Sequence, residues 1–153
     1  MAQNGDTSTR TASDQPATSD PWTRLVAAFL RHDRTTPMRL AEMIDNHPND
    51  AMGPLAKGYM LLMLARRELR IGAMDALAEG RRRLFIRPDA RAAHYATGLA
   101  AWLSGNPRGA IAAMERVIGD NPMDAMAVKI SHAIRFMLGD ADVMVAGGAE
   151  SAV

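Results

Sequence analysis

The sequence predicts an all-α protein, and three observations support this fold class. From Asp20 onward, apolar residues recur at intervals of three and four, which is the period of a helix with one buried face. Short segments rich in Asp, Asn, Gly and Pro separate these runs, as expected for helix caps and turns. No stretch combines β-branched residues with sustained alternation of apolar and polar positions, so we expect no strands.

The first half of the chain contains four predicted helices. The stretch "DPW" at 20–22 combines an Asp N-cap with Pro at the first helical position, and "TP" at 36–37 repeats this combination. The stretch "HPND" at 47–50 ends the second helix and caps the third, and Gly72 separates the third from the fourth. Their apolar positions are Leu25, Val26, Phe29 and Leu30, then Met38, Leu40, Met43 and Ile44, then Leu55, Tyr59, Leu62 and Met63, then Met74, Leu77, Leu84 and Phe85.

Three further helices follow the stop "RPD" at 87–89. The first of them ends at Gly105, and "NP" at 106–107 begins the next, which "DNPMD" at 120–124 terminates. We expect the last helix to cover 125–138 and to stop at the following "GD". Their apolar positions are Tyr95, Leu99 and Trp102, then Ile111, Met114, Val117 and Ile118, then Val128, Ile130, Ile134, Phe136 and Leu138.

The spacing of three prolines indicates that these helices form repeated hairpins. Pro48, Pro88 and Pro122 each follow the second helix of a hairpin, at intervals of 40 and 34 residues. A period of 34 residues with a helix–turn–helix pattern is that of the tetratricopeptide repeat. The sequence thus predicts tetratricopeptide-type hairpins stacked as a short right-handed solenoid.

The domain organisation follows from these elements. Residues 1–19 lack apolar periodicity and are expected to be disordered, whereas 20–140 should form the helical repeat domain. Residues 141–153 read as a short C-terminal tail, too rich in Gly to form a full covering helix. Within the repeat domain, hairpins are expected at about 20–48, 50–88 and 91–122, followed by the single helix 125–138.

Two small residues mark where the helices of the last hairpin should meet. Gly98 lies in its first helix and Ala110 in its second, with Val117 at a later packing position. A larger side chain at Gly98 or Ala110 would hold the two helix axes apart.

The composition excludes several kinds of chemistry. The 153 residues carry a net charge of +1 and contain no cysteine, which excludes disulfides and thiol catalysis. The four histidines form no metal-binding motif, and there is no Gly-rich phosphate loop or nucleophile elbow. We therefore expect no cofactor, no metal and no catalytic residue. No apolar run approaches the roughly 20 residues needed to cross a bilayer, so we expect a cytoplasmic protein without a membrane partner.

An arginine-rich stretch, 66–91, could bind phosphate or an acidic partner. A solvated outer helix face is the simpler interpretation, and we favour it. The stretch has no series of aromatic residues on which bases could stack, so no nucleic-acid partner is expected.

The repeat register predicts a partner-binding groove. The concave surface of such a stack is formed by the first helices of successive hairpins, and the residues expected to line it here are Tyr95, Leu99, Trp102, Lys129 and Phe136. Aromatic side chains beside one cation suit an apolar or amphipathic peptide. Packing of Trp102 and Phe136 against neighbouring helices is the competing interpretation.

The last two predicted units also carry a family-level pattern. Residues 93–140 resemble the tetratricopeptide repeat protein 38 family, and the matching positions are His94, Gly105, Ala110, Pro122, Asp124, Ala127, Lys129, His132, Phe136 and Gly139. The resemblance implies an all-helical superhelix with no established catalytic activity. Members of that family are longer, and this chain corresponds to about their N-terminal third, so it reads as a truncated member.

Three functional hypotheses follow. The leading one is a non-enzymatic repeat protein that binds proteins or peptides, with possible self-association through the apolar C-terminal helix. The second is part of an all-helical enzyme in which His132, Lys129 and His94 share a pocket, although His132 is more simply a partly buried structural residue. The third is a truncated repeat protein without independent function.

Overall fold

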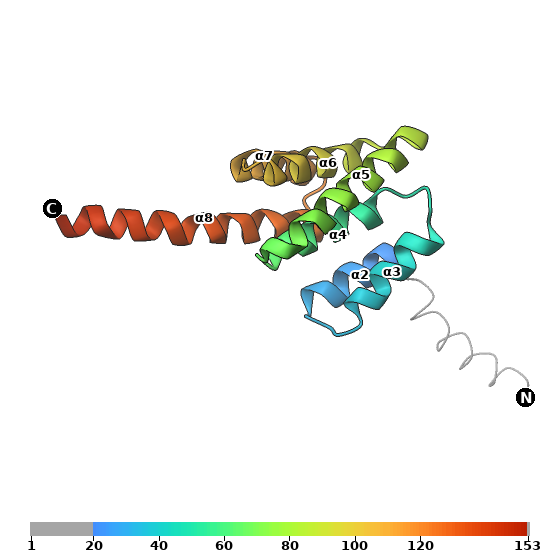
Figure 1. The fold of residues 1–153 in the computed structure, drawn as a ribbon, viewed down its shortest axis with the longest axis horizontal. Coiled ribbons are helices and arrows are strands. Elements are labelled where there is room, and N and C mark those ends of the chain that lie inside the picture. The colour runs from blue at the N-terminus through green and yellow to red at the C-terminus, as the bar shows by residue number, and fades with distance from the viewer. Residues whose placement is uncertain (1–19, 153) are drawn as a thin grey trace, which may run out of the picture.

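The computed structural model describes residues 20–152, with side chains as far as Gly139. This part of the chain contains seven α-helices, one short 3₁₀-helix and no strand, which confirms the all-α prediction (Figure 1). The predicted disorder of 1–19 lies outside the described residues. The elements are α2 (Pro21–Leu30), α3 (Thr36–Asn46), α4 (Met52–Met63), η1 (Arg67–Leu69), α5 (Arg70–Ile86), α6 (Ala90–Leu103), α7 (Pro107–Asp120) and α8 (Ala125–Ala152).

The helices pack in consecutive pairs joined by short turns (Figure 1). Helix α2 packs against α3, α4 against α5, and α6 against α7, while α8 packs against α7. Successive pairs meet through α3 with α4, α5 with α6, and α4 with α6. Helix α2 also contacts α8, so the first and last described helices meet.

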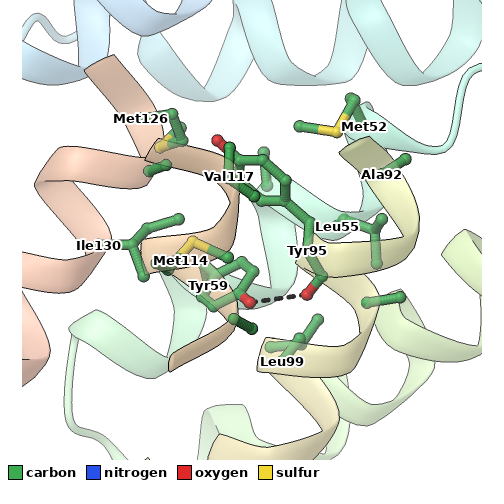
Figure 2. Close-up of a cluster of buried hydrophobic side chains, with 14 of the residues drawn as sticks. Met52, Leu55, Tyr59, Ala92, Tyr95, Leu99, Met114, Val117, Met126 and Ile130 are labelled. Atoms are coloured by element: carbon green, nitrogen blue, oxygen red, sulfur yellow. Dashed lines mark hydrogen bonds between the residues drawn. The ribbon is translucent and has the colours of Figure 1, made fainter. Parts of the chain in front are cut away.

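The core is centred on α4 and α6 (Figure 2). Tyr59, Tyr95 and Leu99 are fully buried there, and the Tyr59 hydroxyl donates a hydrogen bond of 2.6 Å to the Tyr95 carbonyl oxygen. The two tyrosine rings meet edge to face, with centroids 6.0 Å apart. Met114 from α7 and Ile130 from α8 complete this layer. Side chains of four helices therefore share one apolar cluster.

Gly98 lies where α6 approaches both α4 and α7. A Cβ atom added at Gly98 would clash with the Tyr59 hydroxyl and lie 3.1 Å from the Ala113 Cβ. Ala110 is fully buried, and Val117 is 2% exposed. The prediction that these small residues are packing positions is confirmed.

Side-chain caps and one left-handed glycine set the ends of several helices. Asp20 accepts a hydrogen bond from the Thr23 backbone N–H at 2.8 Å, and Asn106 accepts one from the Gly109 N–H at 3.0 Å, as the cap-then-proline pattern predicted. Gly105 ends α6 with φ of +83°, a conformation that favours glycine. The helix at 36–37 begins differently, because its N-cap Thr35 makes no side-chain capping bond.

The last helix is longer than predicted. We expected a helix at 125–138 and a tail at 141–153, but α8 runs from Ala125 to Ala152. Gly139 keeps its backbone N–H, so it costs the helix only about 1 kcal/mol relative to Ala, whereas a proline would break the hydrogen-bond ladder. The chain contains no proline after Pro122. Figure 1 shows the C-terminal half of α8 extending beyond the packed helices.

Candidate peptide-binding groove

Two neighbouring clefts form one apolar groove across the surface. The first, of about 450 Å³, lies between α2, α3 and α4, and the second, of about 520 Å³, lies between α2, α4 and α8. Both are lined by Phe29, Met60 and Leu64, so they adjoin each other. We call their union the apolar groove. Its other lining residues are His32, Thr36, Pro37, Leu40, Ala41, Ile44, Lys57, Leu61, Met63, Lys129, His132, Ala133, Phe136 and Met137.

The groove exposes apolar side chains to solvent. Leu64 is 60% exposed and Phe136 is 70% exposed, and because both line the same cleft they form part of one exposed apolar patch. Met60 and Met63, half-buried on α4, line the same cleft. Methionine is flexible and polarisable, so a surface that contains it can adapt to ligands of different shape.

All the ionisable side chains of the groove are lysines and histidines. Lys57 lies on α4 and Lys129 on α8, and among the described residues neither forms an ion pair. His32 and His132 also line the groove, and no described carboxylate does. Within the part of the chain whose side chains are described, the groove therefore combines an apolar surface with two lysines and no carboxylate.

Helical periodicity explains which α8 residues reach the groove. Ile130, Ser131 and Ile134 are at most 1% exposed and form the buried face of α8. His132 is exposed, because it lies about 100° around the helix from Ser131. The expectation that His132 is partly buried between helices was therefore wrong. Ser131 holds the buried position instead, where its hydroxyl bonds Glu115 at 3.1 Å.

His32 forms the end of α2 at one edge of the groove. Its φ of 56° places it in the left-handed region, where glycine is the usual residue. Its N–H bonds the Phe29 carbonyl at 3.1 Å, and the Asp33 N–H bonds the Ala28 carbonyl at 2.9 Å. This pair of bonds is a Schellman motif with histidine in place of glycine. A strained, non-glycine residue at such a position is a common mark of a functional surface.

The structure places the five predicted groove residues in different environments. Lys129 and Phe136 line the groove. Tyr95 and Leu99 are fully buried, so the prediction that they contact a partner was wrong. Both lie on α6, which packs against α4, α5 and α7. Trp102 is half-buried beside Tyr59, with ring centroids 6.2 Å apart, and does not line the groove.

The family-pattern residues are similarly divided. Ala110, Asp124 and Ala127 are buried, His94 and Lys129 are half-buried, and His132 and Phe136 are exposed. The hypothetical enzyme pocket is only partly assembled, because Lys129 and His132 share the groove while His94 does not line it. The described residues contain no group of three His, Cys, Asp or Glu side chains that could hold a metal.

A buried polar cluster, which the sequence did not reveal, connects three helices next to the core. Asp124 accepts hydrogen bonds from Arg91 Nε at 2.6 Å, from the Tyr95 hydroxyl at 2.7 Å and from the Ala127 N–H at 3.2 Å. The Arg91 guanidinium also lies 5.1 Å from the Trp22 ring centroid. Burial raises the pKa of Asp124, but the bonds from Arg91 and Tyr95 outweigh it, so that pKa lies below its ordinary value. This cluster fixes α2 and α8 relative to α6.

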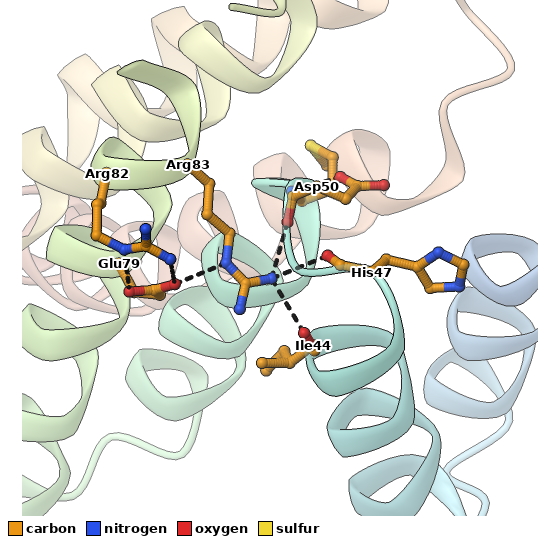
Figure 3. Close-up of polar contacts among 7 residues, drawn as sticks. Ile44, His47, Asp50, Glu79, Arg82 and Arg83 are labelled. Atoms are coloured by element: carbon orange, nitrogen blue, oxygen red, sulfur yellow. Dashed lines mark hydrogen bonds and ion pairs between the residues drawn. The ribbon is translucent and has the colours of Figure 1, made fainter. Parts of the chain in front are cut away.

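One residue of the arginine-rich stretch, Arg83, has a structural role on the α3 side of the groove (Figure 3). Arg83 is 6% exposed, and its Nη1 donates to the carbonyl oxygens of Ile44, His47 and Asp50 at 3.1, 3.1 and 3.2 Å. Its Nε bonds Glu79 at 2.7 Å. A solvated face was thus the wrong interpretation for Arg83. The contact anchors the end of α3, which carries the groove residue Ile44.

Comparison with known proteins adds no relative. The chain matches no protein-family model, no curated protein and no solved structure. The described helices also include none with the length and hydropathy that crossing a membrane requires.

Proposed function

We propose that this chain is a non-enzymatic helical repeat protein that binds an apolar, carboxylate-bearing segment of a protein partner in the apolar groove. One observation carries the proposal: exposed apolar side chains are combined there with Lys57 and Lys129, and no described carboxylate neutralises them. An amphipathic helix with acidic flanks has the complementary chemistry.

The pairing of helices supports a tetratricopeptide-type arrangement as part of this proposal. Helices α4 and α5 pack as one hairpin and α6 and α7 as the next, and the first helices of both hairpins also meet. The close contact at Gly98 agrees with the small residue that such a hairpin needs. The right-handed solenoid and membership in the tetratricopeptide repeat protein 38 family are proposed on this basis and on the pattern in 93–140. A cytoplasmic location is proposed with them, because a chain without cysteine suits a reducing compartment.

The expected energetics identify Phe136 as the main contact. Covering a large apolar side chain contributes about 1.5–3 kcal/mol. Phe136 is 70% exposed, so most of this gain is available on binding. The lysines contribute mainly to the association rate and to selection of acidic over basic partners.

The test uses a synthetic helical peptide with leucines on one face and glutamates on its flanks, labelled for fluorescence anisotropy. We expect Phe136→Ala to weaken binding at least about tenfold, the equivalent of about 1.4 kcal/mol. Lys129→Ala should weaken it less, and more so at low salt. Phe85→Ala is the matched control, because Phe85 is 89% exposed and lies outside the groove. Equal binding by all variants, or equal binding of a peptide with lysine flanks, would refute the proposal.

A further inference from the structure

The C-terminal half of α8, residues 140–152, has the chemistry that the apolar groove selects. Asp140, Asp142 and Glu150 are its only charged residues, and it contains no Lys or Arg. An apolar triplet, "VMV" at 143–145, lies between these carboxylates. The segment is thus acidic and apolar where the groove is basic and apolar.

The course of α8 separates this segment from the groove of its own chain. The first half of the helix lines the groove through Lys129, Phe136 and Met137. The helix then continues unbroken to Ala152 and extends beyond the packed helices (Figure 1). Residues 140–152 span about 20 Å as a helix. A continuous helix cannot turn back, so this segment is directed away from the groove beside which it begins.

From these two features, and on the basis of the proposed function of the groove, we propose that residues 140–152 of a second copy of the chain dock in it. Each copy has both a groove and a segment, so the exchange is reciprocal and closes as a two-fold dimer. The opposite charges of Lys57 and Lys129 on one copy and Asp140 and Asp142 on the other select this pairing. The dimer covers Phe136 and Leu64, the most exposed apolar residues of the groove.

A charge-exchange experiment tests the pairing on the full chain. Sedimentation velocity at low salt and tens of micromolar should show a dimer for the unmodified protein. The segment variant Asp140→Lys/Asp142→Lys and the groove variant Lys57→Glu/Lys129→Glu should each be monomeric, with dimer dissociation constants raised at least about tenfold. An equal mixture of the two variants should dimerise again, because each segment then meets a groove of opposite charge.

The outcomes separate this inference from the proposed function. If the unmodified chain is monomeric, the dimer is wrong. This holds also if the chain is monomeric because residues 140–152 fold onto the groove of their own chain. A dimer that both variants retain, or a mixture that stays monomeric, also overturns the proposed pairing. If the unmodified chain is monomeric but binds the acidic probe peptide, and the groove variant does not, the groove function stands and only the second copy as its ligand is wrong. If the mixture dimerises, the inference is supported directly.

Discussion

Arg91 and Asp124 connect the first turn of α6 to the cap at the start of α8 through a hydrogen-bonded ion pair of 2.6 Å. The Asp124 side chain is 1% exposed and that of Arg91 is 37% exposed. The carboxylate also accepts the Tyr95 hydroxyl and the Ala127 N–H, so one side chain serves as helix cap, ion-pair partner and core acceptor.

Removing the Asp124 carboxylate should therefore destabilise the whole fold. Asp124→Ala leaves the buried Tyr95 hydroxyl without its acceptor and Arg91 without its counter-ion, and we expect a loss of about 3 kcal/mol. Asp124→Asn keeps an oxygen for the cap and for Tyr95, so its loss should be smaller. Urea denaturation followed by circular dichroism measures both. Equal midpoints for Asp124→Ala and the unmodified chain would contradict the role of this cluster.

Glu79 should make stability depend on acid pH. Hydrogen bonds from Arg82 and Arg83 lower the pKa of Glu79 from 4.5 to about 2. Because the pKa of Glu79 is lower in the folded than in the unfolded chain, its charge stabilises the folded state at pH values above the unfolded pKa. This contribution is lost as the pH falls from about 4.5 to about 2. At neutral pH, Glu79→Gln should thus unfold at a lower urea concentration than the unmodified chain. Near pH 2 the urea midpoints of the two proteins should become equal. If the urea midpoints of the two proteins differed by the same amount at every pH, the ionised Glu79 carboxylate would contribute nothing to stability.

Gly98 should tolerate no large side chain. Gly98→Leu places atoms against the Tyr59 hydroxyl and Ala113, and overpacking of this kind costs about 1–3 kcal/mol. Gly119→Ala is the control, because a Cβ at this helical glycine meets nothing within 4 Å. It should stabilise the chain by up to about 1 kcal/mol. We expect the melting temperature to fall for Gly98→Leu and to rise for Gly119→Ala. An unchanged melting temperature for Gly98→Leu would disprove the close contact.

His32→Gly should stabilise the protein while altering the groove. The left-handed backbone at φ 56° costs a non-glycine residue about 1–2 kcal/mol, which glycine does not pay. The melting temperature should rise, and affinity for the acidic probe peptide should fall because one groove side chain is lost. His47→Gly is the control, since His47 has φ of −128° and should gain nothing from glycine. A lower melting temperature for His32→Gly would mean that the imidazole contributes more than the strain costs.

Local sequence signals predicted the helices well and their surroundings less well. Asp20 and Asn106 identify helix starts because a cap and the proline after it act within one turn. The end of α8 was missed because Gly139 resembles a stop, although only the free energy of the whole helix decides whether a glycine ends it. Gly72 was misleading in the same way: it was expected to separate the third and fourth helices, but α5 begins at Arg70 and Gly72 lies inside it.

The groove was predicted in part for a related reason. Helical spacing correctly grouped Lys129 with Phe136 on one face, but it could not show that α4 and α7 cover Tyr95. Met60 and Leu64 were missed although the apolar run at 59–65 is wider than one buried face requires. The apolar residues beyond those of one buried face were the signal that could have predicted a second, exposed apolar surface on this helix. The three carbonyl partners of Arg83 lie 33 to 39 residues away, so no local pattern could reveal them.

The contact between α2 and α8 has a consequence for how the protein opens. In a linear stack each repeat touches only its neighbours, so the two ends fray independently of each other. Here the first described helix packs on the last, and loss of either exposes the other. Amide protons of α2 and of the first turns of α8 should therefore exchange with solvent in a single concerted opening, with the same free energy and the same response to denaturant.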